Sequence, residues 1–464
     1  MTCLQFSDLM SSSCSVDSIL CEAQGRSLFK RKSYQLFHPR QTPDELRVTG
    51  CRCFNPVSGG EDHYTLPNIW HSCRLKHGKG TAIFRVAETS RLNCLSYQIE
   101  IFTLDMELNF GETMPVPALS AAETILKMKQ ESENYAFIDV RSEGEWLKAA
   151  SPGFRNRPLL TNEERHLVGK EYKAKGQAKA IELGEKLVSP LLADRIQDWL
   201  TLAGHKKAVV CCWRGGMRSN LVANWLRERG LETYTVAGGY KALRNHYLDV
   251  LEVERDFVVL SGLTGVNKTG LLNACTVDKV DLELLAKHRG SSFGSFMDES
   301  QPAQVTFENE LAFQLMLMEQ KILLEDESAH IGRIRLPDAI RKKMASASTV
   351  ILEATMDERV RHIIEEYIQQ PMASGVEWDR LRAFTLKHLN RIERRLGGKR
   401  KSEIQSMMMD AFEGRAEHCQ WIALLLEVYY DPMYRYGLER YNRPVLFKGD
   451  FAACKQWIQK NLSG

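Results

Sequence analysis

The sequence predicts an α/β protein with two parallel-sheet domains, the second of which ends in a helical part. In the first domain, strands near residues 135–140, 208–212 and 233–236 alternate with helices, which is the pattern of a parallel sheet. In the second, a short apolar strand enters a Gly-containing loop, and the chain beyond it is mostly helical. We place these domains at residues 113–250 and 251–464.

The composition is that of a globular protein. The 464 residues suffice for two or three domains, with 44% hydrophobic and 26% charged residues, and the net charge of +3 excludes few partners. No apolar run approaches the roughly 18 to 20 residues that a membrane helix requires. The first residues lack a basic region followed by an apolar core, so no secretory signal is predicted. We expect a cytoplasmic protein without membrane contact.

Residues 1–112 differ from the rest of the chain. Up to about residue 105 the sequence has neither sustained helical periodicity nor strand alternation, and it holds seven of the twelve cysteines. These cysteines lack paired C-x-x-C spacing, so we expect free thiols in a reducing compartment and no metal site. We expect an N-terminal extension that is poorly ordered or absent from the native product, which would then start at Met106.

The first domain opens with a helix and a strand. Ser120 is placed to cap an amphipathic helix, and the segment 135–141 follows as a strand that ends in charged residues. The next strand, at residues 208–211, leads into the run Cys212–Ser219, and a helix with one apolar face follows at residues 220–226.

The run Cys212–Ser219 has the spacing C-x5-R-S, which sets a thiol at the mouth of a Gly-rich turn. The unpaired N–H groups of the first helical turn, together with Arg214 and Arg218, favour a thiolate and an anion bound beside it. We therefore predict that Cys212, Arg214 and Arg218 are catalytic. The spacing leaves three interpretations open: a cysteine phosphatase, a sulfurtransferase and a buried structural cysteine.

The second domain begins with a phosphate-binding loop. Residues 262–269 have the form G-x-x-x-x-N-K-T, which is a P-loop with asparagine in place of the last glycine. Asparagine tolerates left-handed backbone angles, so the turn can survive; the alternative is an inactive relic. The residues that we expect to bind phosphate are Gly262, Thr264, Gly265, Asn267, Lys268 and Thr269.

An apolar run that starts at Ile322 ends in three carboxylates, Glu325, Asp326 and Glu327. Glu325 or Asp326 could hold Mg²⁺ through water at a strand end, and an acidic surface turn fits equally well. We leave the metal unassigned.

A basic stripe lies between residues 380 and 401. Spacings of three and four residues place several of its side chains on one helical face, which suits a nucleic-acid backbone or is a solvated helix face. The residues that we predict to contact a nucleic acid are Arg391, Arg394, Arg395, Lys399 and Arg400. Phe293, Tyr430 or Tyr434 could stack on an unpaired base, although core packing is commoner for such residues.

The flanks of the cysteine loop favour sulfur over phosphorus. The residues Asp139-Val140-Arg141, followed by Glu145-Trp146 and Pro152-Gly153, resemble the start of the rhodanese domain, and Val236–Tyr240 resembles its end. The usual rhodanese loop has its arginine one position closer to the cysteine. The longer loop here could admit a bulkier anion, which argues against a simple cyanide or thiosulfate sulfurtransferase.

A rhodanese-like domain fused to a P-loop domain resembles the tRNA 2-selenouridine synthase family, from about residue 135 to 450. The strings that carry the resemblance are Leu160–His166, Val168-Gly169, Tyr172-Lys173, Gly176-Gln177, Cys212–Ser219, His288–Gly294 and Tyr429–Tyr434.

The resemblance implies that 2-thiouridine at the wobble position of tRNA becomes 2-selenouridine, with selenophosphate as the donor and a selenophosphate-producing enzyme as its source. It also implies an S-geranyl intermediate made from geranyl diphosphate. Cys212 would then carry selenium or sulfur, and the loop 262–269 would bind the diphosphate. The rivals are a persulfide sulfurtransferase, a C-x5-R phosphatase fused to a nucleotide-binding module, and a non-catalytic tRNA-binding protein.

Overall fold

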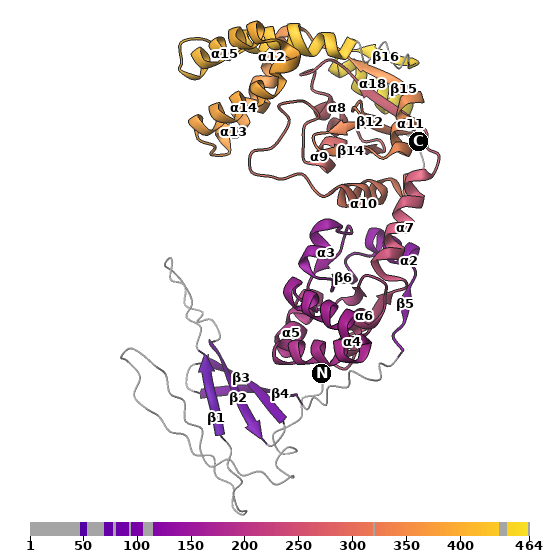
Figure 1. Cartoon of the computed structure of the whole chain (residues 1–464), viewed down its shortest axis with the longest axis vertical. Helices are drawn as coiled ribbons and strands as arrows, with labels where there is room; N and C mark the ends of the chain where they lie inside the picture. The colour runs from indigo at the N-terminus through magenta and orange to yellow at the C-terminus, as the bar shows by residue number, and fades with distance from the viewer. Residues whose placement is uncertain are drawn as a thin grey trace, which may run out of the picture. The chain divides into compact units, whose positions relative to one another are not determined.

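The structure, a computed structural model, describes the backbone of residues 47–52, 69–77, 80–91 and 94–104, and backbone and side chains of residues 115–318, 321–435 and 443–462. The chain divides into two compact units, residues 1–109 and residues 110–464 (Figure 1).

The first unit contains an antiparallel four-stranded sheet in the order β1-β2-β3-β4. Its strands are β1 (Arg47–Arg52), β2 (Ile69–His77), β3 (Gly80–Arg91) and β4 (Cys94–Leu104). The sequence lacks clean alternation there, so its pattern gave no sign of these strands. Met106 and the side chains of the early cysteines lie outside the described residues, and the expectations for residues 1–112 stay predictions.

The second unit begins with a five-stranded parallel sheet in the order β5-β9-β8-β6-β7. Its strands are β5 (Ala118–Leu119), β6 (Tyr135–Asp139), β7 (Arg155–Asn156), β8 (Lys207–Cys211) and β9 (Thr233–Val236). The helices around it are α2 (Ala121–Gln130), α3 (Glu143–Lys148), α4 (Asn162–Val188), α5 (Leu192–Ala203), α6 (Met217–Arg227) and α7 (Gly239–Glu252). The predicted cap at Ser120 is confirmed, because its side chain accepts a hydrogen bond from the N–H of Glu123.

A second parallel sheet follows in the order β11-β12-β10-β15-β16. Its strands are β10 (Phe257–Ser261), β11 (Lys279–Val280), β12 (Ile322–Glu325), β15 (Ser348–Leu352) and β16 (Val445–Gly449). A hairpin and five helices complete this part: β13 (His330–Ile331), β14 (Ile334–Arg335), α8 (Lys268–Ala274), α9 (Leu282–Ala286), α10 (Gln304–Leu315), α11 (Asp338–Ser346) and α18 (Phe451–Leu462). The predicted fold class, two parallel-sheet α/β parts in series, is confirmed.

The helical region lies between β15 and β16 in the chain, and the last strand and helix return to the sheet. Its elements are α12 (Met356–Ile364), a π-helical segment (Glu365–Gln369), α13 (Gln370–Ala373), α14 (Trp378–Leu396), α15 (Gly398–Phe412), α16 (His418–Leu425) and a second π-helical segment (Leu426–Tyr430). They enclose a hydrophobic core of their own around Leu389, Ile404 and Leu426. The helical part is thus an insertion before the last strand of the sheet.

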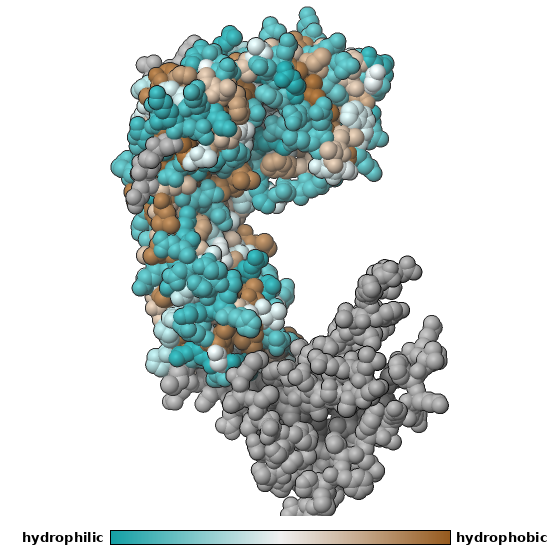
Figure 2. All heavy atoms as spheres, turned by 180° about the vertical axis from the view of Figure 1, so that it is seen from behind, coloured by the Kyte–Doolittle hydropathy of each residue, from teal (hydrophilic) through white to brown (hydrophobic). Residues whose placement is uncertain are grey.

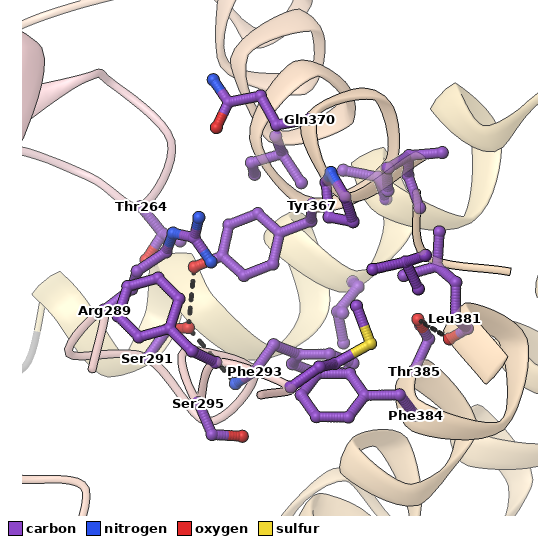
Figure 3. Close-up of a pocket in the computed structure, with 18 of the residues that line it drawn as sticks. Thr264, Arg289, Ser291, Phe293, Ser295, Tyr367, Gln370, Leu381, Phe384 and Thr385 are labelled. Atoms are coloured by element: carbon purple, nitrogen blue, oxygen red, sulfur yellow. Dashed lines mark hydrogen bonds between the residues drawn. The ribbon is translucent and has the colours of Figure 1, made fainter. Parts of the chain in front are cut away.

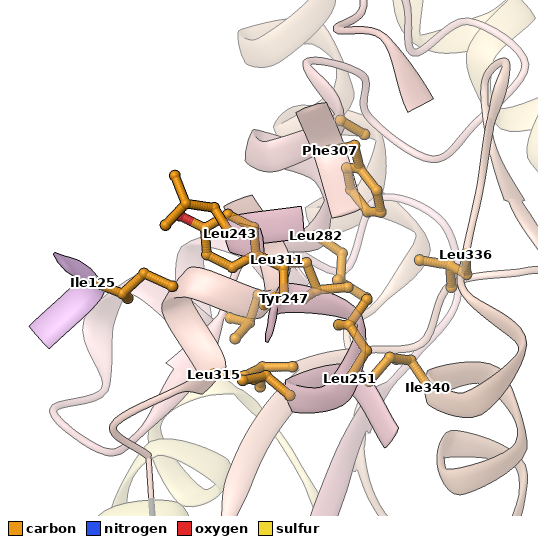
Figure 4. Close-up of a cluster of buried hydrophobic side chains, with 14 of the residues drawn as sticks. Ile125, Leu243, Tyr247, Leu251, Leu282, Phe307, Leu311, Leu315, Leu336 and Ile340 are labelled. Carbon is orange, nitrogen blue, oxygen red and sulfur yellow. The ribbon is translucent and has the colours of Figure 1, made fainter. Parts of the chain in front are cut away.

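Helices α7 and α10 pack against each other in the hydrophobic core that the two parallel-sheet parts share. Tyr247 and Leu251 of α7 are fully buried beside Phe307, Leu311 and Leu315 of α10 (Figure 4). Burial of such side chains contributes about 1.5–3 kcal/mol each relative to exposure. The core is therefore continuous from one sheet to the other.

A buried polar group lies within this contact. Asn309 of α10 accepts a hydrogen bond from Arg244 Nη1 at 2.8 Å and donates to the Tyr240 hydroxyl at 2.9 Å and to the Ala150 carbonyl at 2.7 Å. Its side chain is inaccessible to solvent, so each of these bonds forms where no water can replace it.

Within the described residues, no helix is both long and apolar enough to cross a membrane. Figure 2 shows a mostly hydrophilic face with scattered apolar patches, as globular proteins commonly have.

Replacing Asn309 by Ala should lower the free energy of unfolding by about 1–3 kcal/mol, because three buried partners lose their hydrogen bonds. Urea unfolding followed by circular dichroism measures this change. The matched control is Asn390→Ala at an exposed position of α14. Equal stability of the two variants would show that the Asn309 contacts add nothing to the α7–α10 packing.

Candidate functional site

Cys212 directly follows β8, at the carboxyl edge of the first sheet, where ligands of parallel sheets commonly bind. The loop ends at Gly216, the N-cap of α6. The Cys212 Sγ atom is buried and lies 3.2 Å from the Ser219 hydroxyl, which itself donates to the Gly216 carbonyl at 3.0 Å. The predicted strand, loop and helix are confirmed, with the thiol held against the start of α6.

The Gly238-Gly239 turn packs against the Cys212 loop. The Tyr240 N–H donates to the Cys212 carbonyl at 2.8 Å, and the Lys241 N–H donates to the Trp213 carbonyl at 3.1 Å. Gly215 has φ +65°, and a Cβ there would lie 2.5 Å from the Val236 carbonyl oxygen. A side chain at Gly239 would collide with the backbone of Cys212. The two segments can approach this closely only because both are glycine.

The residues that resemble the rhodanese start support the same loop. Asp139 and Arg141 form a buried ion pair with an N–O distance of 2.6 Å. The Arg141 guanidinium lies 3.8 Å from the centre of the Tyr240 ring and 5.8 Å from that of Trp213. These contacts help to position the Trp213 ring in the loop and the Tyr240 ring after the turn.

Arg218 pairs with Glu145. Its Nη1 lies 2.9 Å from Glu145 Oε2 and its Nη2 lies 3.4 Å from Oε1, while Arg165 Nε lies 3.1 Å from the same carboxylate. Arg214 is exposed. Burial raises the pKa of Glu145, but the hydrogen bond and charge of Arg218 outweigh it, so the pKa lies below its ordinary value. Glu145 is therefore ionised and occupies the arginine that we predicted to hold the anion.

Cys211, the neighbour of Cys212, is the last residue of β8 and is fully buried in the core. Burial raises the pKa of its thiol well above the ordinary value. Cys211 is therefore a packing residue at the end of the strand.

A pocket of about 900 Å³ lies beside the Cys212 loop. Its walls include Trp213 of the loop and Met217 and Arg218 at the start of α6, but not Cys212 itself. The strings that resemble the family line it, from Leu160 through Asn162, Arg165, His166, Val168, Gly169, Tyr172 and Gln177. The sequence did not predict this pocket, because its walls come from helices α3, α4 and α6, which are separate in the chain.

The second anion loop joins β10 to α8. Asn267 adopts φ +69° and ψ +46°, and its side chain accepts a hydrogen bond from the Gly270 N–H at 3.1 Å. The predicted left-handed turn at this position is confirmed. Lys268 donates to the Gly262 carbonyl at 3.0 Å, so the lysine lies across the loop, as in a P-loop.

Side chains of helix α12 contact backbone carbonyls of the P-loop. Arg359 Nε donates to the Thr264 carbonyl at 2.8 Å, and His362 Nδ1 lies 3.1 Å from the Gly265 carbonyl. Arg359 is itself held by Asp431, with Nη1 3.0 Å from Oδ2. The string Tyr429–Tyr434 thus supports the phosphate loop through its aspartate.

Of the two candidate metal acids, Glu325 faces the loop. The Thr269 hydroxyl lies 2.6 Å from Glu325 Oε1 and 3.2 Å from Glu283 Oε2, whereas Asp326 pairs with Arg443 at 2.6 Å. Glu325 is 1% exposed, so an acidic surface turn is wrong for this residue. In the described part of the chain, no group of three His, Cys, Asp or Glu side chains is arranged to hold a metal ion, and no magnesium site is assigned.

Glu283 and Glu325, which contact Thr269, and their neighbour Glu327 have raised pKa values. Burial raises the pKa of Glu283 to about 9 and that of Glu327 to about 7, and the charge of a neighbouring glutamate adds to each shift. Burial also raises the pKa of Glu325. The cluster therefore retains protons near neutral pH, which reduces the repulsion that a phosphate group would meet at this end of the loop.

A pocket of about 320 Å³ opens beside the P-loop (Figure 3). Thr264, Arg289 and Ser291 line one part, and the Ser291 hydroxyl lies 3.3 Å from that of Tyr367. The remaining walls are mostly apolar: Phe293, Phe296, Ile368, Leu381, Phe384, Trp421 and Leu425. The pocket thus joins a polar end at the P-loop to an apolar body.

The aromatic residues that we considered for base stacking differ in their surroundings. Phe293 lines the pocket beside the P-loop. Tyr430 also lines it but is 6% exposed and belongs to the helical core, so the core-packing alternative is confirmed for Tyr430. Tyr434 is half-buried, and burial raises the pKa of its hydroxyl.

The predicted tRNA residues lie on α14 and at the start of α15. All five are exposed: Arg391, Arg394, Arg395, Lys399 and Arg400. Arg391 Nη1 lies 3.2 Å from His388 Nε2, and no carboxylate of the described residues pairs with any of the five. Earlier in the stripe, Arg380 and Arg382 do pair with aspartates. The five cations are available to a polyanion.

Known proteins resemble this chain over most of its length. The chain is 38% identical over 370 residues to the tRNA 2-selenouridine synthase of Shewanella piezotolerans, covering 75% of this chain and 100% of that protein. It is 40% identical over 348 residues to that of Marinobacter nauticus, covering 70% and 94%. The chain belongs to the tRNA 2-selenouridine synthase family. Residues 122–246 match the rhodanese-like domain, and residues 255–463 match the tRNA 2-selenouridine synthase AAA domain.

Family membership confirms the resemblance carried by the sequence strings. Those strings fall around the two anion loops, where they line pockets or brace loop backbones. Glu145, Arg359 and the two pockets were not predicted as site features.

Replacing Glu145 by Gln should free Arg218 and draw anions to the Cys212 loop. We expect the alkylation of Cys212 by anionic iodoacetate to accelerate about 5- to 10-fold relative to neutral iodoacetamide, since an ion pair of this kind is worth about 1 kcal/mol or more. Tandem mass spectrometry of the peptide that contains Cys212 measures both rates. The exposed Glu133→Gln serves as control. An unchanged ratio in Glu145→Gln would show that the carboxylate does not compete for Arg218.

Proposed function

We propose that this protein converts 2-thiouridine at the wobble position of tRNA to 2-selenouridine, with selenophosphate as donor and S-geranyl-2-thiouridine as intermediate. Its relatives in Shewanella and Marinobacter carry the name tRNA 2-selenouridine synthase, which supports a tRNA substrate and a selenium product. A separate enzyme that makes selenophosphate would supply the donor.

The observation that carries the geranyl step is the pocket beside the P-loop. A ligand held there has its anionic end at Thr264 and Arg289 and its body among Phe293, Phe384 and Leu381. A prenyl diphosphate has this distribution of polar and apolar groups, with a diphosphate head and a hydrocarbon chain. A nucleoside triphosphate would instead place a polar ribose against apolar walls, which is unfavourable.

In the first step the sulfur of 2-thiouridine attacks C1 of geranyl diphosphate. The C–S bond forms, the C1–O bond breaks, diphosphate leaves, and N3 of the base loses its proton. Lys268 and the amides of residues 262–269 would stabilise the charge that develops on the leaving group. The protonated carboxyls beside Thr269 keep repulsion of that charge low.

In the second step a selenium nucleophile replaces the alkylated sulfur. The selenium of selenophosphate adds to C2 of the base, the C2–S bond breaks, geranylthiol leaves with a proton, and water cleaves the P–Se bond to release phosphate. Cys212 would bind the selenium donor, and the loop amides, Arg214 and Arg218 would surround the selenophosphate anion. Alkylation makes the sulfur a better leaving group, which gives the first step its purpose.

The exposed cations of α14 and α15 would bind the tRNA backbone. Arg391, Arg394 and Arg395 share one helix, and Lys399 and Arg400 begin the next. Backbone contacts of this kind position a nucleic acid without reading its sequence.

The two steps should respond to different substitutions. Cys212→Ser should abolish selenouridine while sparing geranylation, and Lys268→Ala should lower geranylation at least 10-fold, because a leaving-group contact is lost. Nucleoside mass spectrometry of thiolated tRNA, incubated with geranyl diphosphate and selenophosphate, measures both products.

The controls are Cys419→Ser, at an exposed free cysteine, and Lys460→Ala, at an exposed position of α18. Loss of both products in Cys212→Ser would contradict the division between the loops. Intact geranylation in Lys268→Ala would remove the P-loop from the mechanism. Hydrolysis of a phosphoester without either nucleoside would favour the phosphatase alternative.

A further inference from the structure

The pocket beside the Cys212 loop is far larger than its anion requires. A tetrahedral oxyanion is only a few times larger than a water molecule, whose share of liquid volume is about 30 Å³, whereas this pocket measures about 900 Å³. The amides of the loop can hold such an anion alone. Most of the pocket is therefore left for another part of a ligand.

The walls show what chemistry that part must have. Helices α4 and α6 and the segment before α4 line the pocket with apolar side chains: Leu159, Leu160, Val168, Ala180, Ile181, Leu221 and Trp225. Three large side chains at the pocket remain exposed to solvent, Trp213 by 39%, Met217 by 44% and Tyr172 by 56%. Apolar surface gathered around one concavity is typical of a ligand site.

The polar side chains of the pocket carry a net positive charge. Glu145 and Glu185 contribute two negative charges against three positive charges from Lys148, Arg165 and Arg218, and Asn162 and Gln177 add amide groups. Amides can pair with the O4 and N3 edge of a pyrimidine, and the excess cation suits a nearby phosphate. Trp213, on the loop itself, offers an aromatic face on which a base can stack.

We propose that this pocket binds the S-alkylated 2-thiouracil base, with the base at the polar part beside Trp213 and the alkyl chain along the apolar walls. This inference rests on the proposed function and deepens it, because it assigns the alkylated intermediate to a site of its own. The pocket then selects the alkylated base over 2-thiouracil, which has no chain to bury. The alkyl group is both a leaving group and a recognition element.

The test is calorimetric titration of the full-length protein with the nucleosides S-geranyl-2-thiouridine, S-methyl-2-thiouridine and 2-thiouridine. Saturating geranyl diphosphate is present to occupy the pocket beside the P-loop. We expect S-geranyl-2-thiouridine to bind on the order of 100-fold more tightly than the S-methyl nucleoside, since about half of the additional carbons become buried. Equal affinities would overturn the proposal.

Two variants locate the binding. Ala180→Trp fills the apolar part and should remove the preference for the geranyl nucleoside, while Ala178→Trp, at an exposed position of the same helix, should retain it. Trp213→Ala changes an exposed side chain, so its fold is expected to persist, and it should weaken binding of all three nucleosides about 10-fold. Unchanged affinities in both Ala180→Trp and Trp213→Ala would place the ligand elsewhere and overturn the proposal.

The geranyl diphosphate present in the calorimetric titration distinguishes failure of this inference from failure of the proposed function. Binding of the geranyl nucleoside that disappears when geranyl diphosphate is added would assign the chain to the P-loop pocket and overturn the inference alone. If the unmodified protein binds the geranyl nucleoside but does not geranylate tRNA, the proposed first step is overturned and the pocket assignment stands.

Discussion

Tyr240 joins the Cys212 loop to the P-loop half of the molecule through three contacts. Its N–H donates to the Cys212 carbonyl, its ring lies against the Arg141 guanidinium, and its hydroxyl accepts a hydrogen bond from Asn309. The first contact requires glycine at positions 215 and 239, because a side chain at either would collide with backbone. The geometry of the thiol loop therefore depends on a close backbone approach, and through Tyr240 on the α7–α10 packing.

The two anion sites share one design. Each is a loop at the carboxyl edge of a parallel sheet, followed by a helix N-terminus, and each has an apolar pocket beside it. Each also has glutamate carboxyls near the anion position: Glu145 contacts Arg218, and Glu283 and Glu325 contact Thr269. The glutamate at the first site is ionised, whereas those at the second retain protons near neutral pH, so the two loops present different charge to a ligand.

The sequence predicted what is encoded in contiguous strings. Both anion loops, the strands before them and the left-handed Asn267 could be recognised, because each depends on local spacing or on one residue's backbone preference. The Glu145–Arg218 pair could not, since its partners are 73 residues apart. The choice of Glu325 over Asp326 required the strand register, and the pockets required the packing of helices distant in sequence. Strand β16 escaped notice because the helical region separates it from its neighbour β15.

In the proposed mechanism, alkylation of the sulfur is a prerequisite for the entry of selenium. The most direct measurement is a single-turnover time course on thiolated tRNA, with selenophosphate present throughout and geranyl diphosphate either added or omitted, and with nucleosides quantified by mass spectrometry. With geranyl diphosphate, S-geranyl-2-thiouridine should rise first and then fall as 2-selenouridine forms; without it, 2-selenouridine should be at least 10-fold slower to appear. Formation of 2-selenouridine at the same rate in both reactions would contradict the account.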